Sequence, residues 1–160
     1  MDQEEQLTAL TDYPSKRNQR NAVLAGFLGW TLDAFDFFIL TFVLATIAKD
    51  FDKSIPEMTL TLAASLVMRP VGALLFGLMA DRYGRKKPLM ISIVFYSAIE
   101  VLSGFAPNYS IFLFLRFLYG IGMGGEWGVG ASLVMESVPI KRRGFLSGLL
   151  QEGYAFGFLL

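Results

Sequence analysis

Two aspartates, Asp33 and Asp36, lie in a run from Gly29 to Leu40 whose other residues are almost all apolar. Since they are three positions apart, a helix over this run would carry both carboxyl groups on one face. Carboxyl groups removed from water can take up and release a proton near neutral pH, which is the chemistry that proton coupling needs. The chain has no Cys and no His, which excludes disulfides, thiolate catalysis and Cys/His metal sites. We therefore expect proton chemistry on carboxylates, with no metal and no cofactor.

Further charged residues stand inside apolar runs of the sequence, namely Arg69, Glu100, Arg116, Glu126 and Glu152. Inserting one charge at the centre of a membrane helix costs about 2.5–3.5 kcal/mol, so such residues face a bundle interior or a water-filled cavity. They can serve as sites for protons or substrate, or as structural ion pairs between helices. We favour a functional role for the two aspartates, Arg116 and Glu126, and a structural role for Glu100, near the end of a short run.

The elements that must position these residues are five apolar runs of helical length. They cover residues 22–48, 58–80, 88–105, 111–135 and 144–160, and about 20 apolar residues are enough to cross the hydrocarbon core of a bilayer. The chain is 54% hydrophobic and 18% charged, against about 45–50% and roughly 25% in a soluble domain. We predict an all-α polytopic membrane protein, with a polar cytoplasmic tail at residues 1–20 and a transmembrane helix bundle at residues 21–160.

Basic residues alternate between the breaks that separate these runs. Ten of the 14 Lys and Arg residues lie before the first run, between the second and third, or between the fourth and fifth; two lie in the other breaks. The positive-inside rule therefore places the N-terminus in the cytoplasm. The net charge is zero, so the composition indicates no nucleic-acid partner. Because the last run continues to Leu160 without a polar boundary, we expect the chain to be part of a longer protein.

The fourth run contains closely spaced glycines. Gly120, Gly124 and Gly128 recur every four residues, a spacing that lets a neighbouring membrane helix approach closely. The same stretch also matches the G-x-G-x-x-G pattern of dinucleotide-binding proteins at Gly120, Gly122 and Gly125. That pattern requires a preceding strand within a βαβ unit, and a continuous apolar span does not provide one, so we favour helix packing over nucleotide binding.

Three motifs resemble those of the major facilitator superfamily and occur in the same order. They are the loop "GLMADRYGRK" at residues 77–86, the run "RFLYGIG" at residues 116–122, and "ESVP" at residues 136–139 leading to Arg143 and Gly144. Within the superfamily, "LDAFDFF", "GGEWGVGASLVMES" and "RRGFLSGLLQEGYAFG" are most similar to the sialate:proton symporter group, which includes lactate and other monocarboxylate symporters and sialic acid permeases. The piece at residues 68–72 is also similar to the metabolite:proton symporters, which carry shikimate, citrate or 2-oxoglutarate.

The resemblance implies a twelve-helix secondary transporter in two halves, working by alternating access with substrate bound near the midplane. This chain matches the first five helices, so its expected partners are protons, a small organic anion, the lipid bilayer of the plasma membrane and a missing C-terminal half. Asp36 matches the helix-one acid of related symporters and is the leading candidate for the proton, with Asp33 and Glu126 as further candidates and Arg116 as the ion-pair partner of Asp36.

Two further sets of residues follow from the resemblance. The expected substrate cavity is lined by Arg116, Arg69, Trp30, Trp127 and Gln151. The expected cytoplasmic gate consists of Gly77, Asp81, Arg82, Gly84, Arg85, Glu136 and Arg143. In the family this gate is a charge network that closes the cytoplasmic side.

Two other classes of protein remain as alternatives. A membrane enzyme would need a nucleophile–base pair or a metal cluster, and the sequence shows neither. The polar segments between the apolar runs are also short. A membrane scaffold or a non-functional fragment is the second alternative, since the match ends within the fifth helix.

Overall fold

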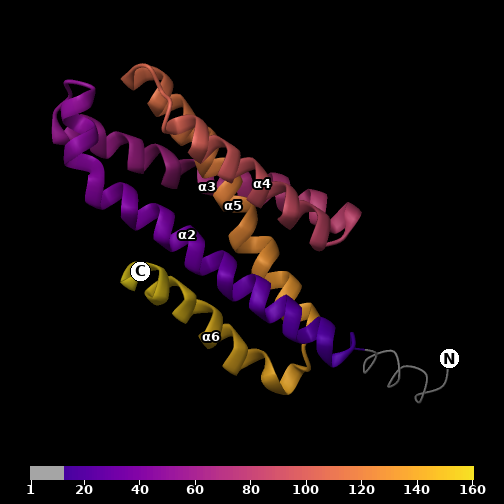
Figure 1. The fold of residues 1–160 in the computed structure, drawn as a ribbon. Helices are drawn as coiled ribbons and strands as arrows, with labels where there is room; N and C mark the ends of the chain where they lie inside the picture. Colours follow the sequence, from indigo (N-terminus) through magenta and orange to yellow (C-terminus); the bar gives the residue numbers. More distant parts are fainter. Residues whose placement is uncertain (1–12) are drawn as a thin grey trace, which may run out of the picture.

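The computed structural model describes residues 13–160, which fold into five helices without a strand (Figure 1). They are α2 (Lys16–Asp50), α3 (Ile55–Tyr83), α4 (Lys86–Ser103), α5 (Tyr109–Ser137) and α6 (Ile140–Leu159). The predicted all-helical class is confirmed, and each predicted apolar run corresponds to one helix; the runs at residues 88–105 and 144–160 extend past the ends of α4 and α6. The predicted tail at residues 1–20 falls largely outside the described residues. Helix α2 begins at Lys16, so residues 16–20 of the predicted tail are helical.

Local sequence signals mark where the helices begin and end. The side chains of Ser15, Ser54 and Asn108 each accept a hydrogen bond from a backbone N–H of the first turn of α2, α3 and α5, respectively. Ser54 and Glu57 form a capping box, in which the glutamate side chain also accepts from the Ser54 N–H. Such caps satisfy N–H groups that have no partner inside a helix. Gly84, with φ +81°, turns the chain between α3 and α4 in a conformation that glycine adopts without strain.

Buried polar groups and exposed apolar groups are distributed as in a membrane bundle. The interior contains Asp33, Arg116 and Glu126, whereas large apolar side chains such as Phe42 and Val94 lie on the outside, 68% and 69% exposed. By length and composition alone, α2 and α3 qualify as candidate membrane spans. The remaining helices are assigned to the membrane from the family comparison given below.

Helix α5 is the centre of the bundle and packs against all four other helices, most extensively against α3 and α4. At Gly120 and Gly124 its backbone meets the backbone of α3 at Ser65 and Arg69, so closely that a Cβ atom at either glycine would collide with it. The predicted glycine stripe is therefore a packing surface at these two positions. It does not extend to Gly128, where a Cβ atom would meet nothing within 4 Å.

Helix α6 lies alongside α2 in a second pair (Figure 1). Here too two glycines four residues apart bring backbones together. A Cβ atom at Gly153 would press on the Phe27 carbonyl of α2, and one at Gly157 would collide with the Thr31 carbonyl. The helices thus form a group of α3, α4 and α5 and a pair of α2 and α6, which meet mainly where α2 crosses α5.

The glycine contact between α5 and α3 gives a first prediction. We expect Gly124→Ala to lower the free energy of unfolding by about 1–3 kcal/mol, because the added methyl group overpacks a backbone contact. The matched control is Gly128→Ala on the same helix, which we expect to be neutral or slightly stabilising because alanine favours helix. Chemical denaturation of the protein in detergent micelles measures both. Equal losses in the two variants would contradict the packing role.

Candidate functional site

Asp33 is the best-enclosed carboxylate of the site and is held by two other helices. It is 0% exposed. The indole Nε1 of Trp127 on α5 donates a hydrogen bond to its Oδ2 at 2.8 Å, and the Nη2 of Arg69 on α3 lies 3.6 Å from the same oxygen. Its other oxygen, Oδ1, is buried with no partner among the described residues. The sequence indicated a buried acid here but did not identify its partners, Arg69 and Trp127, which are 36 and 94 positions further along the chain.

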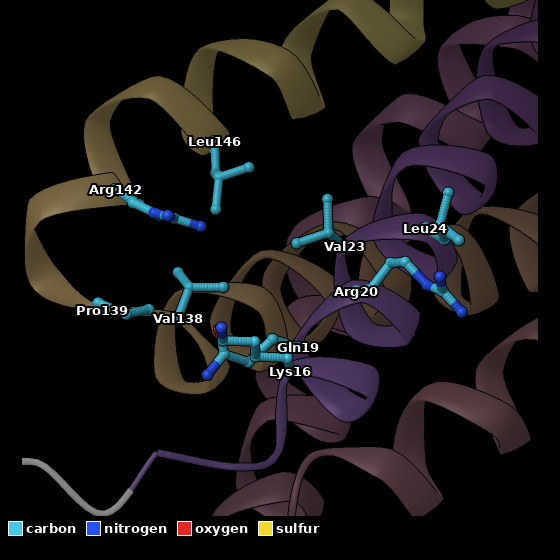
Figure 2. Close-up of a pocket in the computed structure, with 9 residues that line it drawn as sticks. All are labelled: Lys16, Gln19, Arg20, Val23, Leu24, Val138, Pro139, Arg142 and Leu146. Carbon is cyan, nitrogen blue, oxygen red and sulfur yellow. The ribbon is translucent and has the colours of Figure 1, made fainter.

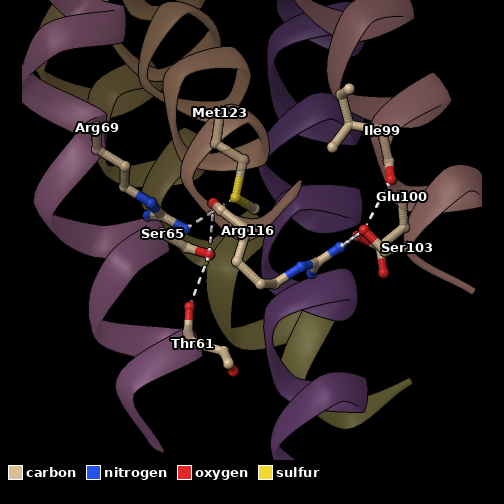
Figure 3. Close-up of polar contacts among 8 residues, drawn as sticks. All are labelled: Thr61, Ser65, Arg69, Ile99, Glu100, Ser103, Arg116 and Met123. Atoms are coloured by element: carbon tan, nitrogen blue, oxygen red, sulfur yellow. Dashed lines mark hydrogen bonds and ion pairs between the residues drawn. The ribbon is translucent and has the colours of Figure 1, made fainter. Parts of the chain in front are cut away.

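Aromatic side chains enclose the Arg69 end of this ion pair. The guanidinium of Arg69 lies over the rings of Trp127 and Phe37, with its Cζ 5.6 and 5.8 Å from their centroids. Its Nη2 also contacts the Sδ of Met123 at 3.2 Å, as Figure 3 shows. Cation–π contacts of this kind stabilise a cation by about 0.5–2 kcal/mol. Arg69 therefore has one ionic partner, Asp33, at 3.6 Å, and its other neighbours are aromatic rings and a thioether sulfur.

The two expected tryptophans meet at the crossing of α2 and α5. Trp30 stacks on Trp127 with ring centroids 4.9 Å apart, and Tyr154 of α6 meets Trp127 edge-on at 6.2 Å. Sequence reasoning missed Tyr154, although its position in an apolar run close to Gly153 was a usable signal. The other expected cavity residue on α6, Gln151, is exposed and is not brought into this cluster.

Glu126 is enclosed beside the same crossing. It is 1% exposed, and neither of its carboxylate oxygens has a hydrogen-bond partner among the described residues. The space for this carboxylate exists because position 29 on α2 is glycine; a Cβ atom there would collide with the Glu126 Oε1. An unpaired charge in such surroundings is costly.

Arg116 forms a separate ion pair toward the opposite end of the bundle from the gate residues. Figure 3 shows its guanidinium directed at α4, where Nη2 lies 2.5 Å from the Glu100 Oε2 and 2.6 Å from the Ser103 Oγ. The side chain is 0% exposed and also lies over the ring of Tyr119, 4.4 Å from its centroid. The backbone carbonyl of Arg116 accepts a hydrogen bond from the Ser65 Oγ at 3.1 Å.

This geometry differs from the predicted pairing of Arg116 with Asp36. The described residues place Glu100 at the guanidinium, because α4 packs along α5 and brings the i, i+3 pair Glu100 and Ser103 to the same face. Asp36 is partly buried, and no ion pair involving it is found within residues 13–160. The structural role expected for Glu100 agrees with its position, and the i, i+3 spacing with Ser103 was the signal that the sequence offered.

Three of the expected gate residues come together at the α3–α4 turn. The Arg85 Nη1 lies 2.7 Å from the Asp81 Oδ1, and its Nε lies 3.0 Å from the Glu136 Oε1 at the end of α5. The hydrogen bond with Glu136 is the main cause that raises the pKa of Arg85 above its ordinary value, so the guanidinium stays charged.

The other expected gate residues do not join this network. Arg82 lies over the ring of Tyr83, and Arg143 donates weakly to the Val138 carbonyl at 3.4 Å. Gly84 provides the turn, whereas Gly77 faces open space.

The sequence pattern of the Major Facilitator Superfamily matches residues 26–160. The chain belongs to this superfamily. This confirms the resemblance found in the motifs, and it identifies the five helices as the first helices of a polytopic membrane protein.

Curated relatives of the chain are named as transporters. The putative niacin/nicotinamide transporter NiaP of Bacillus subtilis is 39% identical over 142 residues, which are 89% of this chain and 36% of that protein. The probable 4-methylmuconolactone transporter of Cupriavidus pinatubonensis is 35% identical over 89% of this chain and 33% of that protein. The sialic acid transporter NanX of Escherichia coli is 34% identical over 89% of this chain and 35% of that protein. The chain thus spans about a third of the length of these relatives, none of which is named as an enzyme.

The ion pair between Arg116 and Glu100 gives a second prediction. Removing one partner of a fully buried pair costs about 3–5 kcal/mol; because the Glu100 side chain is 33% exposed, we expect Glu100→Gln to cost about 1–3 kcal/mol. Denaturation in micelles measures this loss. Glu152→Gln, at an exposed position of α6, is the control and should change little. In the double variant Glu100→Gln/Arg116→Gln we expect a smaller loss than the sum of the two single losses; strict additivity would contradict a direct pair.

Proposed function

We propose that this chain is the N-terminal portion of a secondary transporter that moves a small organic anion together with a proton by alternating access. The observation that carries the proposal is the enclosed cluster of Asp33, Arg69 and Trp127, which joins α2, α3 and α5. It combines a group that can accept a proton with a cation that can bind an anion. Membership in a superfamily with transporters among its members, and the names of the relatives, support transport over the enzyme alternative.

The cluster suggests how proton and anion are coupled. A proton on Asp33 removes the negative charge that faces Arg69, and the guanidinium is then free to bind the carboxylate of a substrate in a bidentate manner. When the proton leaves, Asp33 competes with the substrate for the same arginine. We therefore rank Asp33 above Asp36 as the proton carrier, because it is Asp33 that lies beside an arginine. Asp36 and Glu126 remain secondary protonation sites of the proposal.

Several classes of anion fit a site with one arginine and aromatic walls. The first candidates are lactate-like monocarboxylates and sialate, and the alternatives are shikimate-type, dicarboxylate and tricarboxylate substrates. One relative is named as a sialic acid transporter and another as the shikimate transporter of Escherichia coli. The tryptophan stack beside Arg69 also suits flat or ring-shaped anions, so nicotinate belongs in the test panel.

The proposed orientation in the plasma membrane has the N-terminus in the cytoplasm. It is supported by the basic residues at the start of α2, at the α3–α4 turn and at the start of α6. In that orientation Asp81, Arg85 and Glu136 form the cytoplasmic gate, closed when the substrate site faces outward. The C-terminal half of the transporter would complete the cavity, and a scaffold without transport is the alternative function.

The third prediction concerns coupling. We expect Asp33→Asn, made in the full-length gene product, to abolish accumulation of the substrate against its gradient under an imposed proton gradient, because the amide cannot exchange the proton. Uptake of labelled lactate, sialate, shikimate, 2-oxoglutarate and nicotinate into proteoliposomes measures this. Counterflow exchange in the same vesicles shows whether the variant still binds substrate.

The control for this experiment is Asp52→Asn, in the exposed break between α2 and α3, which should accumulate substrate like the unmodified protein. If Asp33→Asn accumulates substrate normally, Asp33 is not the proton carrier. If the unmodified protein transports none of the anions, or transports one without responding to the proton gradient, the proposed function is wrong.

The fourth prediction concerns the gate. Asp81→Asn removes one of the two carboxylates that hold Arg85, and partly exposed ion pairs contribute about 0.2–1 kcal/mol each. We expect the population open to the cytoplasm to rise by up to about fivefold. The alkylation rate of a single cysteine introduced at Met135, near the cytoplasmic end of α5, reports this population. Asp50→Asn, at the opposite end of α2, is the matched control, and an unchanged rate in Asp81→Asn would remove Asp81 from the gate.

A further inference from the structure

A cavity outside the candidate site opens between the first turns of α2, the α5–α6 turn and the beginning of α6 (Figure 2). It has a volume of about 550 Å³. We propose that it binds an anionic phospholipid, with the phosphate headgroup at its basic rim and the start of an acyl chain along its apolar wall. The proposal depends on the membrane setting of the bundle and not on transport, so either can fail without the other.

Charge is the first observation that points to an anion. Lys16 and Arg20 of α2 and Arg142 of α6 line the cavity, and no acidic residue of the described chain is among its walls. Within residues 13–160, no ion pair neutralises any of these three cations. Arg85, on the same side of the bundle, is instead held by two carboxylates. Among the described residues, the cavity therefore carries positive charge that no carboxylate neutralises.

The start of α6 adds to this positive character. Its N-cap residue, Pro139, also lines the cavity, and no side chain caps this helix end. The N–H groups of a first helical turn lack partners within the helix, and the helix dipole places partial positive charge there. This end of α6 thus supplements the three cationic side chains, which remain the main source of charge.

The order of charged and apolar residues indicates a lipid rather than a soluble anion. Both α2 and α6 begin at this end, so higher residue numbers lie deeper in the membrane. Val23 and Leu24 follow Arg20 by three and four positions, and Leu146 follows Arg142 by four, which is one helical turn or about 5.4 Å. Figure 2 shows Arg142 and Leu146 of α6 extending toward Val23 of α2. A phosphate with an attached acyl chain has the same sequence of charge and then hydrocarbon.

General physical chemistry makes the fit favourable. Anionic headgroups attract basic residues at the membrane surface, by about 1 kcal/mol for each Lys or Arg, and basic pockets between membrane helices bind such headgroups. Leu24 is 50% exposed, so its side chain is accessible to an acyl chain. A free phosphate ion would make no use of the apolar wall.

The fifth prediction tests this site by native mass spectrometry of the purified full-length gene product with added phosphatidylglycerol or phosphatidylcholine. We expect retained phosphatidylglycerol, and affinity lower by about tenfold or more in Lys16→Gln/Arg20→Gln/Arg142→Gln, because three charges are lost. The matched control is Lys86→Gln/Lys87→Gln/Lys141→Gln, which removes the same charge from the same side of the bundle outside the cavity. Thermal melting of each variant confirms folding.

A second arm separates lipid from free phosphate. We expect Val23→Gln/Leu146→Gln, which keeps all three cations, to weaken phosphatidylglycerol binding as well, and inorganic phosphate at equal concentration not to displace the lipid. Any of three results would overturn the proposal: equal loss in the control variant, equal retention of phosphatidylcholine, or displacement by inorganic phosphate with unchanged binding in Val23→Gln/Leu146→Gln.

Discussion

The rest of the structure depends on how charges are accommodated inside a bundle whose outer surface is apolar. Asp33, Arg116 and Glu126 are each 1% exposed or less, and a buried charge is tolerated only beside a partner or as a neutral form. Two of them are provided with partners from other helices, Arg69 for Asp33 and Glu100 for Arg116. The third, Glu126, has no hydrogen-bond partner for either carboxylate oxygen among the described residues.

Glycine contacts set the positions of these partners. The backbone of α5 at Gly124 touches that of α3 at Arg69, so the residue that neutralises Asp33 is anchored where the two helices are closest. Three positions along α5 from this contact, Trp127 donates to the same carboxylate. The packing of α3 on α5 and the ion pair between Asp33 and Arg69 are therefore coupled, because a shift of α3 along α5 would disturb both.

The sequence was sufficient for the helices, because polar breaks and apolar length act within a single segment. The contact of Asp81 with Arg85 was accessible for the same reason, since they are four residues apart in one turn. The sequence also predicted the buried charges Asp33, Arg116 and Glu126, but Glu152, expected to face the interior, is exposed. The pairing of distant charges was not accessible. Arg116 was expected to meet Asp36 and instead meets Glu100, because its partner depends on the rotation of α5 and on which neighbour lies against each of its faces. The residues of a single helix determine neither its rotation nor which helix packs against each of its faces.

The paired glycines at Gly153 and Gly157 have a mechanical consequence. They bind α6 to α2 in the way that Gly120 and Gly124 bind α5 to α3, so the bundle consists of two stiff bodies with backbone-to-backbone contacts inside each. The boundary between them is softer, lined by the Trp30 and Trp127 rings and by the Glu126 carboxylate against Gly29. Flat rings can slide over one another where interlocked backbones cannot. A change of charge at Asp33 or Glu126 would thus act at the boundary between these two groups of helices.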